Sequence, residues 1–572
     1  MKEQEFELSI RADGYDAQEL RNLSIVGQRE EEIITRLQSS APLLLEGIRG
    51  SGKTTLLKLA VERTNQPDRV ATGDLAAYVS FSRYLLLENP SIPAGPQHPF
   101  NLWVCTKILH AVYEVAKSVT GDSPPVTGLA PLLEARFDNV ITTLESTHKL
   151  SSNEAASLQL LPDSVRRVLL SFLNPDKLRA CLVEILTAFG LRTVNLLCDE
   201  AAQYFKPEFQ PLFFSILKSI HCPNIYFKAA IYPTVTYFGA DFELGHDASV
   251  VPLTRPCLTT EWMNFCRDIT ARRAANEKLW SDNPVLLESL AYAAFGIPRR
   301  FIELVGNVDV STSSELDVLN AIKNHAQREL LQPFDALRAR IPTLIRDVEL
   351  ASYLLHLFID DLKQENTVRT YRTAYVAISK HRALPYALRK ATNLLVYLGI
   401  LERQAPCKLG HTRETADRLL VNPAIIIAEN LLADSTKRKL SLNEVNERIK
   451  LLELDKFREY SRNNKSLQEA VEEASSVQSK PCPQCGTDLP FEARFCTNCG
   501  AAQSQTSVLA QVLSLSSSDL DLTPGIKAKV IAKFATIGSV LEATDNDLDA
   551  LYQVGPVRVA IIRHSVDEAI SG

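Results

Sequence analysis

The chain lacks any apolar run close to the roughly 18 residues that a membrane-spanning helix needs. Its opening segment, MKEQEFELSIRADGYDAQEL, lacks the apolar core of a secretory signal. Net positive charge is lacking too. The formal charge of the 572 residues is -6, which excludes a uniformly basic surface but not a local basic patch. We therefore expect a cytoplasmic protein that does not bind membranes.

Several catalytic motifs are also absent. The sequence contains no G-x-S-x-G, no H-E-x-x-H and no carboxylate cluster of the kind that nucleases use. These absences argue against a hydrolase or nuclease effector within this chain. Of the 11 cysteines, seven are scattered, several of them in apolar patterns, which favours reduced, buried thiols, and the other four form a cluster.

A phosphate-binding motif is present in the segment APLLLEGIRGSGKTTLLKLA. It reads G-x-x-x-x-G-K-[ST] between a strand pattern and a helix pattern, where backbone N–H groups and the positive end of the helix can cradle phosphates. We expect Lys53 to reach the β- and γ-phosphates and Thr54 to ligate Mg²⁺. The expected nucleotide contacts of the loop are Gly47, Ile48, Arg49, Gly50, Ser51, Gly52, Lys53, Thr54 and Thr55.

A second element supports a nucleotide site. The segment VNLLCDEAAQYF is an apolar strand pattern that ends in Asp199 and Glu200. A carboxylate at such a strand tip can hold Mg²⁺, and the next one can orient the attacking water. Asp199 is therefore the second magnesium candidate, and Lys53, Asp199 and Glu200 are catalytic candidates. ATP and Mg²⁺ are the expected cofactors.

Alternating strands and helices predict an α/β fold at the amino-terminal end of the chain. Strand candidates are Leu43–Leu45, Tyr78–Phe81, Val194–Cys198, Ile225–Ile231 and Val250–Leu253. The predicted units are an ATPase core over 1–256 with a helical insertion over about 83–190, a helical lid over 257–330, a winged-helix domain over 331–432, a helical linker over 433–478, a zinc ribbon over 479–502 and a small helical domain over 510–572.

Two further segments resemble motifs of AAA+ ATPases. LSIVGQREEEIITRL resembles the box that helps to form the adenine pocket of that family, matched here by Ile25, Val26, Gly27 and Arg29. GIPRR resembles the sensor-2 motif of the lid, in which an arginine touches the γ-phosphate. Arg299 fits that role best, as a further catalytic candidate, and Arg300 is second.

The order of core, lid and winged helix is similar to that of the origin-recognition family of initiator ATPases. That resemblance implies a homo-oligomer with ATP sites between subunits that binds double-stranded DNA, in replication, a mobile element or defence. The chain is also similar to STAND-type signalling ATPases, which implies action through a protein partner instead. A helicase or loader motor is the third alternative.

Two departures from the AAA+ pattern concern turnover. Only Tyr232 or Thr234 is available as the polar sensor-1 residue. No arginine lies between Asp199 and the strand near Val250, the usual place of a trans-acting arginine finger. Arg255 could substitute, or could form a surface salt bridge. Since a finger contributes about 10³–10⁵ in rate, we expect slow hydrolysis, with ATP acting mainly as an assembly switch.

Residues 366–418 hold a local excess of basic residues that suits phosphate contacts. LPYALRKATNLLVYLGI could be a recognition helix, with Asn393 near its exposed side, and ERQAPCKLGHTRETADRLLV a wing. The alternative is a solvated basic face that packs on a neighbouring subunit. The candidate DNA contacts here are Arg382, Tyr386, Arg389, Lys390, Lys408 and Arg413.

The cysteine cluster is CPQCGTDLPFEARFCTNCG, in which two C-x-x-C pairs are separated by ten residues. Cys482, Cys485, Cys496 and Cys499 predict a tetrahedral Zn²⁺ site of a zinc ribbon. Four thiolates leave no open position, so the metal is expected to be structural. Two disulfides are the alternative. The spacing does not decide whether the ribbon meets DNA or a protein partner.

The carboxyl-terminal segment resembles tandem helix-hairpin-helix domains, with hairpins at TPGIKAK and QVGPVRV. In that family, backbone N–H groups of the hairpin meet a DNA phosphate and a nearby cation assists, which points to Lys527, Lys529 and Arg558. Both hairpins lack the second glycine of the family, and Pro556 removes an N–H. A structural or protein-docking role is therefore the alternative.

Overall fold

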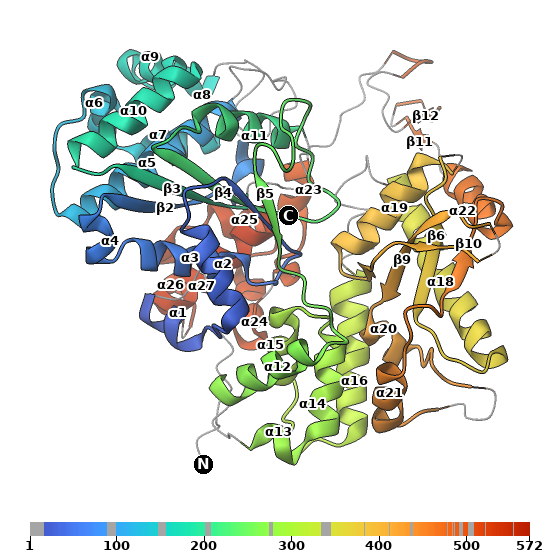
Figure 1. Cartoon of the computed structure of the whole chain (residues 1–572). Coiled ribbons are helices and arrows are strands. Elements are labelled where there is room, and N and C mark those ends of the chain that lie inside the picture. The colour runs from blue at the N-terminus through green and yellow to red at the C-terminus, as the bar shows by residue number, and fades with distance from the viewer. Residues whose placement is uncertain are drawn as a thin grey trace.

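A computed structural model describes the chain over residues 17–87, 99–146, 156–200, 208–273, 278–332, 334, 345–382, 384–410, 412–434, 439–476, 479–482, 484–485, 487–490, 496–500, 508–520, 522–552 and 554–571. An α/β core leads into a helical region, a second α/β unit, a short cysteine-bearing hairpin and a helical carboxyl-terminal unit (Figure 1). No helix in these ranges is both long and apolar enough to cross a membrane.

The core is a five-stranded parallel sheet in the order β2-β3-β4-β1-β5. Its strands are mostly apolar because helices cover both faces. Each of the five predicted strands is confirmed. Since the strands are parallel, the carboxyl ends of all five meet at one edge, where ligands bind in such sheets. The strands are β1 (Leu43–Glu46), β2 (Asp74–Ser80), β3 (Thr193–Asp199), β4 (Ile225–Ile231) and β5 (Ser249–Pro252).

One face of the sheet is covered by the amino-terminal helices α1 (Ala17–Leu23), α2 (Gln28–Leu37) and α3 (Lys53–Thr64). The short α4 (Pro67–Ala71) leads from α3 into β2. Leu37 and Leu57 are completely buried in this layer, between the helices and the sheet.

The opposite face of the sheet is covered by helices of the predicted insertion, which runs between β2 and β3, and by α11 (Phe209–Ile220). Trp103 is completely buried in this layer and donates its indole N–H to Glu145 (3.0 Å). The insertion contains α5 (Pro99–Thr120), α6 (Ala130–Ala135), α7 (Phe137–Glu145), α8 (Ala156–Gln159), α9 (Asp163–Ser171) and α10 (Pro175–Ala188).

The next region is helical, as expected for the predicted lid. Trp262 of its first helix donates its indole N–H to Ala291 O (2.8 Å), which fixes that helix against the third one. The helices are α12 (Thr260–Arg273), α13 (Leu279–Asp282), α14 (Pro284–Ala293), α15 (Pro298–Gly306) and α16 (Glu315–His325), followed by a π-helical stretch (Ala326–Leu331).

The second α/β unit has a mixed sheet in the order β10-β6-β9-β7, with β8 paired to β9. A helix-turn-helix needs two consecutive helices, but α19 is the one helix between β6 and β7 among the described residues, so the winged helix stays a prediction. The elements are α18 (Ile345–Val368), β6 (Tyr375–Ser379), α19 (Tyr386–Tyr397), β7 (Leu401–Arg403), β8 (Cys407–Lys408), β9 (Thr415–Val421), α20 (Pro423–Ala428), α21 (Leu442–Lys450), β10 (Arg458–Tyr460) and α22 (Lys465–Ser476).

The segment predicted as a helical linker belongs to this unit instead. Strand β10 pairs in parallel with β6, and α22 packs on α18. Tyr460 is fully buried, its ring lies 5.1 Å from that of Phe358, and its hydroxyl donates to Asp361 (2.8 Å). Strand β10 has only three residues, which is too short for an alternation of apolar and polar residues to be recognised in the sequence.

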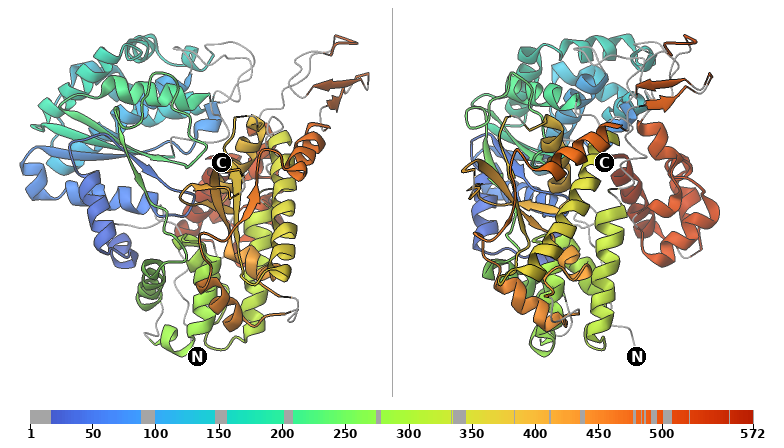
Figure 2. Two further views of the ribbon diagram at one scale, coloured as in Figure 1. Left: turned by 45° about the vertical axis from the view of Figure 1, so that its right-hand side comes forward. Right: turned by 90° about the vertical axis from the view of Figure 1, so that its right-hand side faces the viewer.

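The carboxyl-terminal unit lies alongside the ATPase core and has a small core of its own (Figure 2). The two predicted hairpin segments lie where α24 and α27 begin. The last turn of α27 and the first helix of the unit join the main core through Ile570 and Val512. The unit follows the hairpin of β11 (Ser479–Pro481) and β12 (Asp488–Pro490), and its helices are α23 (Val508–Ser514), α24 (Pro524–Lys533), α25 (Ile537–Glu542), α26 (Asp545–Asp549) and α27 (Pro556–Ser571).

Candidate nucleotide-binding and metal sites

The phosphate loop turns from the end of β1 into α3 and needs glycine at two positions. Gly50 and Gly52 have φ of 83° and 93°, in the left-handed region that disfavours other residues. A Cβ at Gly50 would also lie 2.9 Å from the Cβ of Arg299. The backbone N–H of Arg299 donates to Gly50 O (3.3 Å), so α15 of the lid rests directly on the loop.

Lys53 lies at the centre of this loop and is 7% exposed. Its Nζ donates to Gly47 O (2.6 Å) and Ile48 O (3.1 Å) and lies 4.1 Å from the ring centroid of Tyr232. Burial lowers the pKa of Lys53 to about 7. The Asp199 carboxylate raises this pKa, whereas the guanidinium groups of Arg49 and Arg299 lower it further. A phosphate would relieve this concentration of positive charge.

Ser51, in the same loop, has a buried hydroxyl with no hydrogen-bond partner among the described residues. Buried polar groups are normally hydrogen-bonded, so this hydroxyl is available to bind a ligand. The donors of the loop therefore fit a bound phosphate chain.

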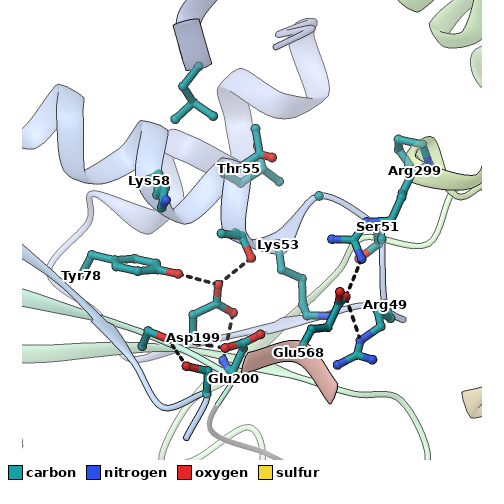
Figure 3. A pocket seen from close by; sticks show the side chains of 18 of the residues that line it. Arg49, Ser51, Lys53, Thr55, Lys58, Tyr78, Asp199, Glu200, Arg299 and Glu568 are labelled. Carbon is teal, nitrogen blue, oxygen red and sulfur yellow. Dashed lines mark hydrogen bonds and ion pairs between the residues drawn. The ribbon is translucent and has the colours of Figure 1, made fainter. Parts of the chain in front are cut away.

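The Thr54 side chain, in the first turn of α3, meets Asp199 at the end of β3. The Thr54 hydroxyl donates to Asp199 Oδ2 (2.6 Å). The Tyr78 hydroxyl donates to the same oxygen (3.0 Å; Figure 3). A hydroxyl beside a carboxylate is an oxygen donor set that suits Mg²⁺ in P-loop NTPases. The two predicted magnesium ligands therefore lie together.

Glu200 adjoins this pair, with a left-handed φ of 55°. Its backbone N–H donates to Asp199 Oδ1 (3.0 Å), and its carboxylate accepts from Ser80 (3.4 Å). Positive φ in a residue other than glycine is found at functional sites, where the surroundings hold it in place. The strained turn places the Glu200 carboxylate beside Asp199 at the same edge of the sheet.

These side chains line a pocket of about 650 Å³, within the range of ligand sites. Its lining also includes the apolar side chains of Ile25, Ile33, Phe265 and Ile269, next to charged side chains such as Arg29. Apolar side chains beside a polar phosphate loop suit a nucleobase and its phosphates.

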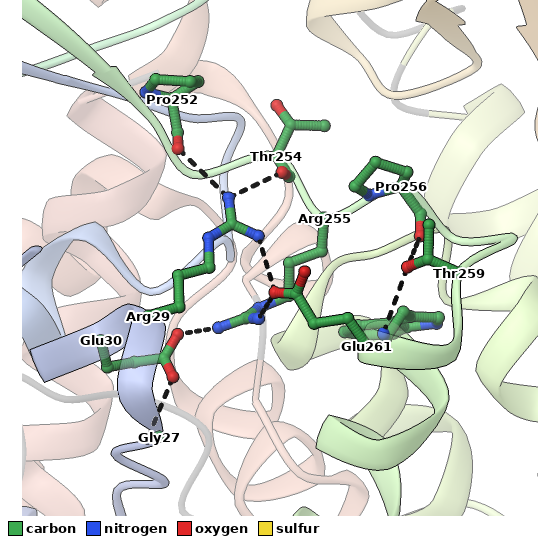
Figure 4. A network of polar contacts seen from close by, with 10 residues as sticks. Gly27, Arg29, Glu30, Pro252, Thr254, Arg255, Pro256, Thr259 and Glu261 are labelled. Atoms are coloured by element: carbon green, nitrogen blue, oxygen red, sulfur yellow. Dashed lines mark hydrogen bonds and ion pairs between the residues drawn. The ribbon is translucent and has the colours of Figure 1, made fainter. Parts of the chain in front are cut away.

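The predicted adenine box is only partly in this pocket. Ile25 and Arg29 line it, while Val26 packs into the core and Gly27 caps α2, donating its N–H to Glu30 (3.1 Å). Arg29 donates to Thr254 O (2.9 Å) and to Pro252 O (3.3 Å), which ties α2 to the end of β5 (Figure 4).

Arg255, the substitute finger considered from the sequence, is an internal cation of this chain. It is 7% exposed, and its guanidinium pairs with Glu30 and with Glu261 (3.0 Å; Figure 4). It also lies 3.9 Å from the ring centroid of Phe265. It forms a salt bridge, as the alternative expectation had it, but the pair with Glu30 is buried and only the partner Glu261 is exposed. These contacts within the chain do not favour the finger role, which stays a prediction.

The finger position itself stays without an arginine. Lys218 is tied to Asp247 (2.7 Å), and Lys228 is buried and donates to backbone carbonyls. Lys206 lies outside the described residues. The absence of an arginine here, on which the prediction of slow hydrolysis depends, therefore still holds.

For each of the two sensor positions, the structure places one of the two candidate residues in the pocket and the other outside it. Arg299 lines the pocket, whereas Arg300 is turned away and donates to Leu398 O (2.9 Å) and Gly399 O (3.3 Å). Tyr232 lines the pocket, whereas the hydroxyl of Thr234 donates to Asn393 O (2.9 Å) of α19. Arg300 thus connects the lid, and Thr234 the core, to the second α/β unit.

Three cations of the pocket meet carboxylates that the sequence did not point to. Glu568 Oε1 lies 3.0 Å from a guanidinium nitrogen of Arg299 and 3.8 Å from Arg49 Nε (Figure 3). Asp567 accepts two hydrogen bonds from Arg83 (3.0 and 3.1 Å). Nothing local marks these residues, because they come from α27, at the far end of the chain.

The basic stretch of the second unit divides into exposed and occupied cations. Arg382, Arg389, Lys408 and Arg413 are exposed and make no ion pair with another residue that the structure describes, and Lys390 lies 3.9 Å from Asp347. Tyr386 is 66% exposed beside Arg389 and Lys390.

Other cations of the stretch hold the fold together. Arg418 is buried and donates to Leu454 O (2.7 Å), and Arg403 donates to Asn393 Oδ1 (2.9 Å). Asn393 itself faces the core, since its amide donates to Thr234 O (3.4 Å). The expectation that Asn393 lies on the exposed side of α19 was therefore wrong.

The four clustered cysteines come together as a metal-binding set. Their Sγ atoms all lie within 4.8 Å of one another. The Cys482–Cys499 and Cys485–Cys496 pairs are 3.7 and 3.6 Å apart, too far for disulfides but close to the roughly 3.8 Å edge of a tetrahedron with Zn–S bonds of about 2.3 Å. The set therefore fits a Zn²⁺ ion.

In the carboxyl-terminal unit, the three basic candidates lie on the two helices that follow the predicted hairpins. Lys527 and Lys529 are on α24, and the exposed Arg558 is in the first turn of α27. Lys529 Nζ lies 5.6 Å from the ring centroid of the exposed Tyr552, which directly precedes the second hairpin segment.

The parallel sheet and its loop define a P-loop nucleotide-binding fold. No protein-family model and no curated protein matches the chain. Among similar solved structures is the Orc1 protein of Aeropyrum pernix in complex with DNA, at 17% identity and a TM-score of 0.26, with 71% of this chain and 92% of that chain covered. A TM-score of this size carries no argument, so the assignment rests on the sheet and the pocket themselves.

Proposed function

We propose that the chain is an AAA+-type ATPase that binds ATP, hydrolyses it slowly, assembles as a multimer and binds double-stranded DNA, as origin-recognition initiators do. The observation that carries the ATPase part is the meeting of Lys53, Thr54 and Asp199 in one pocket at the strand ends. When bound, Mg²⁺ would neutralise phosphate charge, held by Thr54 and Asp199. Glu200 orients the attacking water, and Arg299 contacts the terminal phosphate.

Contacts between the pocket and the basic unit support nucleotide-dependent DNA binding. Tyr232, which lies against Lys53, packs edge-on against Tyr397 of α19 at 5.6 Å. Thr234, two residues further, bonds Asn393 of the same helix. The other end of α19 presents Tyr386 and Arg389 to solvent. A movement of the phosphate loop can therefore reach the proposed DNA face through side chains that pack directly on one another.

Zinc would be held by Cys482, Cys485, Cys496 and Cys499 as a structural ion. A hairpin as short as β11–β12 cannot bury enough apolar surface to fold alone, so the metal would stabilise it. The ribbon and the carboxyl-terminal unit would supply further contacts, to DNA or to a protein partner.

The experiment that tests this function is binding to a labelled duplex of random sequence, with ATP, ADP or no nucleotide, over a salt series with mass recorded by light scattering. We expect ATP-dependent binding with an increase in mass. R389E/K390E should bind more weakly and with a smaller salt dependence, by about one unit of slope per lost phosphate contact. The control K117E/K177E makes the same charge change on α5 and α10, away from the proposed DNA face.

Unchanged affinity in R389E/K390E would move the DNA site elsewhere. Absence of DNA binding in every nucleotide state would overturn the DNA part of the proposal. That outcome would favour the STAND-type alternative, a signalling or scaffold ATPase that acts through a protein partner.

A further inference from the structure

The last helix of the chain reaches into the nucleotide pocket. Asp567 and Glu568 are consecutive residues near the carboxyl end of α27, and together with His564 they form part of the pocket wall. Side chains of consecutive helical residues diverge, so the two carboxylates reach different sides of the pocket. Asp567 meets Arg83, which follows β2, and Glu568 meets Arg49 of the phosphate loop and Arg299 of the lid.

The contact is a packed interface rather than a single surface ion pair. Ile570, one turn from these carboxylates, is fully buried in the main core. The 3-10 turn Tyr84–Leu87, directly after Arg83, contacts both α27 and α23. Val512 of α23 is also fully buried. Apolar packing therefore places Asp567 and Glu568 at the arginines.

The two arginines that form ion pairs with Glu568 are ones that a bound triphosphate would need. Arg49 belongs to the phosphate loop, and Arg299 is the residue in position to contact a terminal phosphate. Guanidinium groups pair with carboxylate and phosphate through the same donors. A phosphate brought to these donors would lie beside the Glu568 carboxylate, and like charges at such a distance repel.

We propose that α27 is an internal competitor of the nucleotide: its carboxylates hold Arg49, Arg83 and Arg299 in the nucleotide-free chain, and a nucleoside triphosphate displaces them and releases the carboxyl-terminal unit. This inference rests on the proposed nucleotide site and adds its regulation. Phosphate number matters in this mechanism. A monophosphate leaves the position next to Arg299 empty and does not displace Glu568.

The first test measures affinity for a fluorescent ATP analogue. D567N/E568Q keeps the size and polarity of both side chains and removes their charge. We expect it to bind roughly tenfold more tightly than wild type, because the competent state is no longer a minor population. The matched control, E542Q/D549N, removes two exposed charges from α25 and α26 of the same unit and should bind as wild type does.

Three outcomes are distinguishable. Tighter binding by D567N/E568Q alone supports the proposal. Equal binding by wild type and both variants overturns the competitor role and leaves the nucleotide site intact. No binding by any of them overturns the nucleotide site and the competitor role together.

The second test uses the unaltered chain, so it does not depend on the folding of a variant. Hydrogen exchange is followed in the last turns of α27, near Ile570, with no nucleotide, with AMP and with a non-hydrolysable ATP analogue. We expect faster exchange with the ATP analogue only. Exchange that stays the same with the analogue bound, or that slows, overturns the proposal.

Discussion

Replacement of Arg255 tests how the pocket wall around Glu30 and Phe265 is held in place. The Arg255–Glu30 pair is buried on both sides, with side-chain exposures of 9% and 8%, whereas Glu261 is 56% exposed. The exposed pair contributes little, so the effect of a substitution depends on Glu30. Arg255→Met leaves the Glu30 carboxylate buried without its cation, which destabilises a fold by about 3–5 kcal/mol.

The neutral double variant separates charge from packing. E30Q/R255M has no buried charge left at this place, so we expect it to recover most of the loss, apart from about 1 kcal/mol for the contact between Arg255 and Phe265. Urea unfolding followed by tryptophan fluorescence is the assay. All three tryptophans, Trp103, Trp262 and Trp280, lie in the ATPase core or the lid, so the signal reports these parts.

The result that would refute this reasoning is specific. If R255M unfolds at the wild-type urea concentration but loses ATP turnover, Arg255 acts on the bound nucleotide, in its own pocket or in that of a neighbouring subunit. The structure, with Arg255 enclosed by Glu30, Glu261 and Phe265, predicts the opposite order of effects: stability falls first, and turnover falls only as the fold is lost.

Two further predictions concern bound ions and protons. Cys482→Ser should remove the zinc measured in the purified protein, while Cys407→Ser, in β8 of the second unit, should retain it; equal zinc in both variants would contradict the four-cysteine site. ATP binding should raise the lowered pKa of Lys53, about 7 in the free chain, so that the protein takes up roughly 0.8 of a proton at about pH 7.5 and roughly 0.1 at about pH 6. Calorimetry in buffers of different ionisation enthalpy measures this proton uptake. In Lys53→Arg the guanidinium stays protonated, so the uptake due to residue 53 should disappear. The same uptake in both proteins would show that Lys53 is not its source.

The parts of the site that are local in sequence could be predicted from it. The phosphate loop carries its own conformational requirement at Gly50 and Gly52. The Asp199–Glu200 pair follows directly on an apolar strand. Parallel strands then bring these ends together, so Thr54 and Asp199 meet without further information. The four cysteines are likewise fixed by their spacing.

The parts that depend on distant contacts could not be predicted. The carboxylates of Asp567 and Glu568 reach the pocket through the packing of α27 on the core, and no local pattern records that packing. Arg255 carries a charge, which favours the surface, and its burial follows only from the presence of Glu30 on another helix. Arg299 and Arg300 are adjacent, and their separation depends on the orientation of α15.

The central claim is that the loop around Lys53 binds a nucleoside triphosphate and that Glu200 serves its hydrolysis. The most direct measurement is a titration of a fluorescent ATP analogue into wild type, Lys53→Ala and Glu200→Gln, with ATP turnover recorded on the same preparations. The account predicts saturable binding by wild type and Glu200→Gln, none by Lys53→Ala, and turnover by wild type alone. Binding by Lys53→Ala as tight as that of wild type would contradict it, and turnover by Glu200→Gln at the wild-type rate would contradict the role of Glu200.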